Sequence, residues 1–178
     1  MDSLAPSRIW VMRLCYAGLA MVILFFHLLP LDSLPRGWAA PDLLLALTLA
    51  WALRRPDFVP PVLIAIVILL ADLLLQRPPG LLAALTVAGA AFLHSRFGGH
   101  GETGFVAEWL AVAVVLIAIA LLYRIVLAIT SVDQAPLFLM ASQLLLTILI
   151  YPLVAGSSQA VFGVRRLTPA DAEALGAR

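Results

Sequence analysis

The sequence contains no lysine, a single cysteine and few charges of either sign. All eleven basic residues are arginines, charged residues make up 12% of the 178 positions, and the net charge is +1. No basic cluster is dense enough to hold a nucleic acid backbone, so nucleic acid binding is not expected. Cys15 cannot form an internal disulfide, and no cysteine–histidine spacing suits zinc. We attribute the absence of lysine to nucleotide composition.

Apolar residues, in contrast, are abundant. They make up 63% of the chain, and the mean hydropathy is +1.08, well above that of a soluble domain. About 20 apolar residues cross a bilayer, and shorter runs cross where protein packs around them, so the apolar runs predict six transmembrane helices. Their predicted bounds are 9–31, 41–53, 58–75, 81–94, 105–129 and 137–161. The expected fold is an all-α, polytopic membrane helix bundle in a single domain over 1–178, with a short cytoplasmic C-terminal tail.

Two of these spans have a second interpretation. The first could be a signal peptide, since Arg8 precedes the apolar run and residues 38–40 resemble a cleavage site, although the run is long for one. The second is short and could re-enter the membrane instead of crossing it. Pro41 at its start and Asp42 in its first turn nevertheless favour a helix N-terminus. A small capped helix is predicted in the tail, over 167–176.

Arginines at the ends of the spans predict the orientation, because cytoplasmic loops are enriched in positive charge. With the N-terminus inside, eight arginines lie on the cytoplasmic side: Arg8, Arg13, Arg54, Arg55, Arg96, Arg165, Arg166 and Arg178. Only Arg36 and Arg77 lie outside, and Arg124 is within a span. We therefore predict that both termini are cytoplasmic. Losing the second crossing would put most of the later arginines on the wrong side, which argues against re-entry.

An acidic residue inside an apolar run marks the centre of the chain. A carboxylate such as that of Asp72 is costly in hydrocarbon and by default faces protein or water. The turn that follows contains Pro78, Pro79 and Gly80 and should reverse the chain. The next helix carries a stripe of small residues, which lets a second backbone come close: Gly80, Ala84, Ala88 and Ala91. We interpret this hairpin as the packing centre of the bundle.

Two charges at similar depth could form an ion pair within the bundle. Asp72 lies about three residues, and Arg124 about five, from the outer end of its span, so at ~1.5 Å per residue both are within roughly 10 Å of one surface. An unpaired charge at a span centre costs about 2.5–3.5 kcal/mol on insertion scales, which favours pairing. In the alternative, Arg124 extends to the surface and Asp72 is hydrated there.

Polar residues on the last span form another candidate. Gln143, Thr147 and Tyr151 share one helical face, and Pro152 leaves the carbonyl of Ile148 without its helical donor. The stripe could line a substrate groove or form a satisfied contact between helices.

No catalytic or metal-binding constellation is recognisable in the sequence. The three histidines lack ligand spacing, and the glycine-rich loop 97–101 lacks the lysine of a phosphate loop. The segment 156–158 is not a nucleophile elbow, since no strand precedes it. Glu108 is expected at the opposite surface from Asp72, so the two cannot act as an acid–base pair. We therefore predict neither enzymatic activity nor a cofactor.

Two segments in the central third of the chain have distinctive patterns. The first, 41–59, is a short helix that opens with Pro-Asp and ends with Trp and Arg-Pro. The second, 69–85, is a hairpin of the L-x-D-L-L…P-x-G kind. Together the two segments resemble the MreD family, the membrane subunit of the bacterial rod-shape system. The matching residues are Pro41, Asp42, Trp51, Arg55 and Pro56 in the first segment and Asp72, Pro79 and Gly80 in the second. The hairpin departs from the family at 77–80, where a Pro-Leu-Gly is expected.

The resemblance implies a non-enzymatic scaffold of the cell-elongation complex in the bacterial inner membrane, which helps to organise peptidoglycan synthesis and cell shape. The expected partners are an MreC-like single-span periplasmic protein, RodA with its class B transpeptidase and, directly or indirectly, the actin-like MreB. The family's fold is similar to the substrate-binding subunits of energy-coupling vitamin transporters, which supplies an alternative function, the binding of a small molecule. An outward pocket with polar groups would mark that alternative, and Asp72, Gln76, Arg124 and Gln143 lie near the right depth. A third possibility, an intramembrane hydrolase or lipid-modifying enzyme, lacks any motif.

Overall fold

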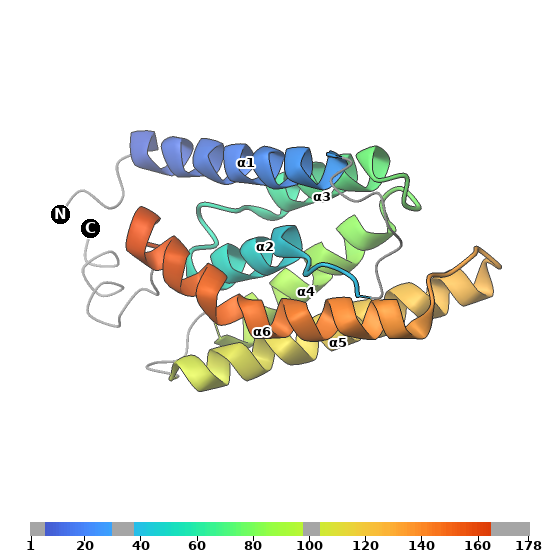
Figure 1. Cartoon of the computed structure of the whole chain (residues 1–178). Coiled ribbons are helices and arrows are strands. Elements are labelled where there is room, and N and C mark those ends of the chain that lie inside the picture. The colour runs from blue at the N-terminus through green and yellow to red at the C-terminus, as the bar shows by residue number, and fades with distance from the viewer. Residues whose placement is uncertain (1–5, 30–37, 98–103, 165–178) are drawn as a thin grey trace.

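The structure is a computed structural model that describes residues 6–29, 38–97 and 104–164. Within these ranges the chain forms six α-helices and no strand. Their bounds are α1 Pro6–Leu28, α2 Leu43–Arg54, α3 Pro61–Leu74, α4 Leu81–Phe97, α5 Phe105–Ile129 and α6 Leu137–Phe162 (Figure 1). The predicted all-α class is confirmed, and each predicted span coincides with one helix to within a few residues. The predicted tail helix at 167–176 lies outside the described residues.

Among the described helices, three are long and apolar enough to cross a membrane, namely α1, α5 and α6. The other three are apolar but shorter, with 12, 14 and 17 residues in α2, α3 and α4. At about 1.5 Å per residue they extend roughly 18 to 26 Å, less than the ~30 Å hydrocarbon core of a bilayer. The architecture is compatible with a membrane helical bundle, and six crossings stay a prediction.

The shortest helix forms the centre of the bundle. Every residue of α2 from Leu44 to Arg54 is buried, because α1, α4 and α6 pack around it (Figure 1). A helix that is apolar on all sides is expected to be enclosed by other helices. The helix begins two residues later than predicted, at Leu43, so Asp42 is its N-cap and does not lie in its first turn. The Asp42 carboxylate accepts a hydrogen bond from the N–H of Leu45 at 2.9 Å.

The close contact between α4 and α5 does not use the predicted stripe of small residues. Ala84, Ala88 and Ala91 are exposed on the surface of the chain. Gly89 instead faces α5, where a Cβ atom would lie 2.8 Å from Cγ1 of Val115 and 3.1 Å from Cδ1 of Ile119. A shift of one residue rotates the face of a helix by about 100°. The prediction that this stripe packs against another helix of the same chain is therefore wrong. That it contacts a partner protein stays a prediction.

The break in helical hydrogen bonding at Pro152 is compensated by a neighbouring helix. The sequence predicts that the carbonyl of Ile148 lacks its helical donor. In the structure the indole N–H of Trp109, in α5, donates to this carbonyl at 2.9 Å. The carbonyl that the proline leaves free is therefore the acceptor of a hydrogen bond between α5 and α6.

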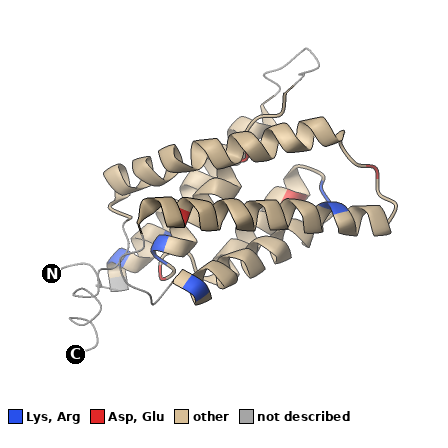
Figure 2. Cartoon of the chain, turned by 90° about the horizontal axis from the view of Figure 1, so that it is seen from below, with Lys and Arg blue, Asp and Glu red and all other residues tan. Residues whose placement is uncertain are grey.

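The two ends of the bundle differ in charge (Figure 2). One end contains the start of α1 and the ends of α2 and α4, and most of the basic residues lie there. The arginines of these segments are Arg8, Arg13, Arg54, Arg55 and Arg96. The other end contains the α3–α4 turn with Arg77 and the last turns of α5 with Arg124, and we call it the Arg124 end. The described arginines thus divide as the sequence predicts, and the orientation in the membrane stays a prediction.

Candidate functional site

A cavity of about 550 Å³ opens at the Arg124 end of the bundle. It lies between the start of α2, the α3–α4 turn, the second half of α5, the first half of α6 and the α5–α6 turn. Its apolar wall includes Leu45, Leu82, Leu116, Ile119, Leu127 and Leu144. Its polar wall includes Asp42, Gln76, Arg77, Tyr123, Arg124 and Gln143. Three of the four residues expected in an outward pocket line this cavity, and Asp72 does not.

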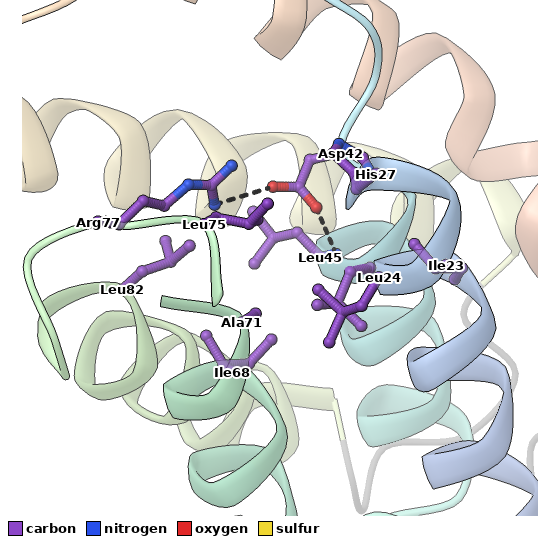
Figure 3. Close-up of a pocket in the computed structure, with 11 residues that line it drawn as sticks. Ile23, Leu24, His27, Asp42, Leu45, Ile68, Ala71, Leu75, Arg77 and Leu82 are labelled. Carbon is purple, nitrogen blue, oxygen red and sulfur yellow. Dashed lines mark hydrogen bonds and ion pairs between the residues drawn. The ribbon is translucent and has the colours of Figure 1, made fainter. Parts of the chain in front are cut away.

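Asp42 lies at the edge of the cavity and connects three parts of the chain. Figure 3 shows two of its contacts, with Leu45 and with Arg77. Besides capping α2, its carboxylate lies 3.7 Å from the guanidinium of Arg77, with the two side chains 16% and 28% exposed. The backbone N–H of Asp42 donates to the hydroxyl of Thr147 in α6 at 2.8 Å. Apolar side chains, among them Leu24 and Ala71, close a crevice of about 10 Å³ beside this pair, room for a single water. Asp42 therefore joins α2, the α3–α4 turn and α6.

Asp72 is fully buried and holds the α3–α4 turn. Its Oδ2 accepts a hydrogen bond from the N–H of Gly80 at 3.1 Å, while Oδ1 has no hydrogen-bond partner among the described residues. Its backbone carbonyl accepts from Arg77 at 2.9 Å. Gln76 and Gly80 have positive φ of 55° and 85°, a conformation that costs glycine least. The carboxylate thus lies at the N-terminus of α4, where the helix dipole favours a negative charge.

The proposed ion pair between Asp72 and Arg124 is wrong. The guanidinium of Arg124 donates to the carbonyl of Ala135 at 3.1 Å and to the sulfur of Met140 at 3.7 Å, and it pairs with no described carboxylate. The physical reason is the packing order, because α4 contacts both α3 and α5 and lies between them. The alternative of a hydrated Asp72 is wrong as well, since the residue is buried.

The polar face of α6 has both of the roles that the sequence left open, since one part lines the cavity and the other forms contacts between helices. Gln143 lines the cavity, and its amide has no hydrogen-bond partner among the described residues. Thr147 and Tyr151, one and two turns further along, are buried in contacts between helices. The face is therefore a cavity wall at one end and a helix–helix contact at the other.

A buried ionic cluster at the opposite end was missed by sequence reasoning. Nε of Arg54 donates to Oε1 of Glu108 at 2.8 Å, with side chains only 6% and 4% exposed. The hydroxyl of Tyr151 donates to the same oxygen at 2.8 Å, and Arg54 also donates to the carbonyl of Ala155 at 2.9 Å. The cluster joins α2, α5 and α6. The available signal was an arginine in the last turn of one helix and a glutamate in the first turn of another.

The structure brings most of the predicted site residues to one end of the bundle. Around the cavity lie Asp42, Arg124 and Gln143, and the adjoining turn contains Asp72, Pro79 and Gly80, whereas Ala84 and Ala88 lie on the exposed face of α4. Across the described ranges, no group of three or more His, Cys, Asp or Glu is placed to hold a metal ion. Comparison with protein families, with curated proteins and with solved structures finds no match to this chain.

Proposed function

We propose that this chain is a non-enzymatic scaffold of the bacterial cell-elongation complex, similar to MreD. In this role it crosses the inner membrane six times with both termini in the cytoplasm. It binds an MreC-like single-span protein directly and joins RodA, the class B transpeptidase and MreB through the assembly. Its contribution to peptidoglycan synthesis is to hold these partners together.

The contact between the two MreD-like segments carries this proposal. Asp42 of the first segment and Arg77 of the second are 35 residues apart in the sequence, yet their charged groups lie 3.7 Å apart. Within the second segment, Asp72 binds the N–H of Gly80 at 3.1 Å. Of the residues behind the resemblance, Asp42 thus contacts the turn that contains Pro79 and Gly80, and Asp72 binds within the same turn. This shared local structure supports a common role for the two segments.

The exposed stripe on α4 supports a binding surface for a single transmembrane helix. Ala84, Ala88 and Ala91 face away from the chain, and small residues allow the backbone of another helix to come close in lipid. We propose this stripe as the contact for the span of the MreC-like protein.

Co-expression with the MreC-like protein of the same organism tests the proposal. We expect a tagged form of this chain to capture that protein from detergent in a fixed ratio. Ala88→Leu should reduce capture, because a larger side chain holds the two helices apart. Ala118→Leu, on the exposed face of α5, is the matched control and should capture normally. A folded wild-type chain that captures none of the partner would refute the scaffold function.

The alternative function, a substrate-binding membrane subunit of a small-molecule transporter, is supported by the cavity at the Arg124 end. Its volume of about 550 Å³ lies within the range of known ligand pockets, roughly 300–1,000 Å³. Such a subunit should co-purify with the ATP-binding module of an energy-coupling transporter and not with an MreC-like protein. The identity of the captured partner therefore distinguishes the two functions.

A further inference from the structure

The wall of the cavity at the Arg124 end has an apolar part of substantial size. Leu139 and Leu144 of α6 are only partly buried and line the cavity, and the buried side chains of Leu116 and Ile119 in α5 lie behind the same wall. Burial of apolar surface drives the binding of ligands with hydrocarbon chains. A small hydrophilic solute would leave this wall without a matching surface.

The polar part of the wall has one positive charge that no carboxylate balances. Asp42 lies beside Arg77 at 3.7 Å and offsets its charge. The guanidinium of Arg124 donates only to a neutral carbonyl and a thioether among the described residues. Asp133 also lines the cavity, but it is exposed and forms no ion pair with Arg124. The charge available to a ligand is therefore that of Arg124.

Further hydrogen-bond donors lie near the guanidinium of Arg124, and residues of the α5–α6 turn bind this arginine. The amide of Gln143 and the hydroxyl of Tyr123 line the cavity, are partly buried and have no hydrogen-bond partner among the described residues. The side chain of Gln134 donates to the backbone carbonyl of Arg124 at 3.2 Å, while Arg124 donates to Ala135. An arginine fixed in this way loses little freedom on binding an oxyanion, which it prefers over neutral groups.

We propose that this cavity binds an amphiphile with one anionic headgroup, a phosphate or a carboxylate, joined to an apolar chain. Arg124, Gln143 and Tyr123 hold the headgroup, and Leu139 and Leu144 contact the chain. The ligand can originate from the membrane, as a phospholipid, or from outside it, as an apolar acid. This site deepens the alternative function proposed above and is compatible with the scaffold function, which depends on a different surface.

Titration of the purified full-length chain in a neutral maltoside detergent tests the site, with binding followed by native mass spectrometry. The four probes are dioctanoyl phosphatidylglycerol, decanoate, dioctanoyl phosphatidylcholine and inorganic phosphate. We expect one saturable site for at least one of the two anionic amphiphiles, and which one binds identifies the source. Phosphatidylcholine should bind at least tenfold more weakly, and inorganic phosphate should not saturate the site. Equal binding of charged and zwitterionic lipid, or no saturable amphiphile, would overturn the proposal.

Two variants separate the headgroup from the chain. Arg124→Gln should lower the affinity for the anionic amphiphile at least tenfold, whereas Arg96→Gln, an exposed arginine at the opposite end, should leave it unchanged. Ala120→Phe fills the cavity wall without changing a charge and should also abolish binding. Each variant is first compared with wild type for its melting temperature without ligand. Unchanged affinity in a folded Arg124→Gln or Ala120→Phe variant would exclude the site.

Capture of the MreC-like protein by Arg124→Gln should stay normal, so a failed ligand site and a failed scaffold function give different results.

Discussion

Replacement of Gly89 by alanine is expected to destabilise the protein although it introduces a better helix former. In a helix interior, alanine is favoured over glycine by about 0.8–1.0 kcal/mol. Here the added Cβ would lie 2.8 Å from Cγ1 of Val115 and 3.1 Å from Cδ1 of Ile119, closer than atoms normally pack. Val115, the nearer of the two, is 4% exposed and does not line the cavity, so its side chain has no open space to move into. Overpacking typically costs about 1–3 kcal/mol, which gives a net loss of roughly 0–2 kcal/mol.

A second glycine provides the matched control for this prediction. Gly156 also lies inside a helix, but a Cβ there meets nothing within 4 Å, so Gly156→Ala should gain up to about 1 kcal/mol. The difference between the two alanine variants isolates the steric term, about 1–3 kcal/mol, or some 2–12 °C in melting temperature at about 2–4 °C per kcal/mol. The assay is thermal unfolding of both variants in one detergent. In a Val115→Ala background, which carries its own cost for the lost methyl groups, Gly89→Ala should be less destabilising than in the wild type. Equal stabilisation by both alanine substitutions would refute the close approach of α4 and α5.

Three other substitutions test the polar contacts, each by unfolding in detergent. Arg54→Met removes the guanidinium that binds the buried carboxylate of Glu108 at 2.8 Å and should cost about 3–5 kcal/mol. The double variant with Glu108→Leu should be milder than the sum of the single losses, and additive losses would contradict the pair. Trp109→Phe removes the donor to the carbonyl of Ile148 and should cost about 1–3 kcal/mol, but less in a Pro152→Ala background, where the helix supplies its own N–H. Asp42→Ala removes the cap of α2 and should cost about 0.5–2 kcal/mol, while a neutral result would show that Thr147 alone holds this end.

The sequence by itself determined the helices and their ends, because these depend on neighbouring residues along the chain. Apolar runs between proline- or glycine-containing turns were enough to predict the bounds of all the described helices to within a few residues. The carbonyl freed by Pro152 was predicted for the same reason, as was an acidic residue at the start of α2, although Asp42 caps that helix and does not lie in its first turn. Both follow from backbone hydrogen bonding within one or two turns of helix.

Only the tertiary structure decided which side chains meet. The rotation of each helix about its axis and the order of packing are set by all the neighbouring helices together. A rotation of about 100° gives the contact with α5 to Gly89 instead of Ala88. The position of α4 between α3 and α5 separates Asp72 from the arginine proposed as its partner. In the same way, the convergence of α2, α5 and α6 pairs Glu108 with an arginine 54 residues away, a contact that no local pattern predicts.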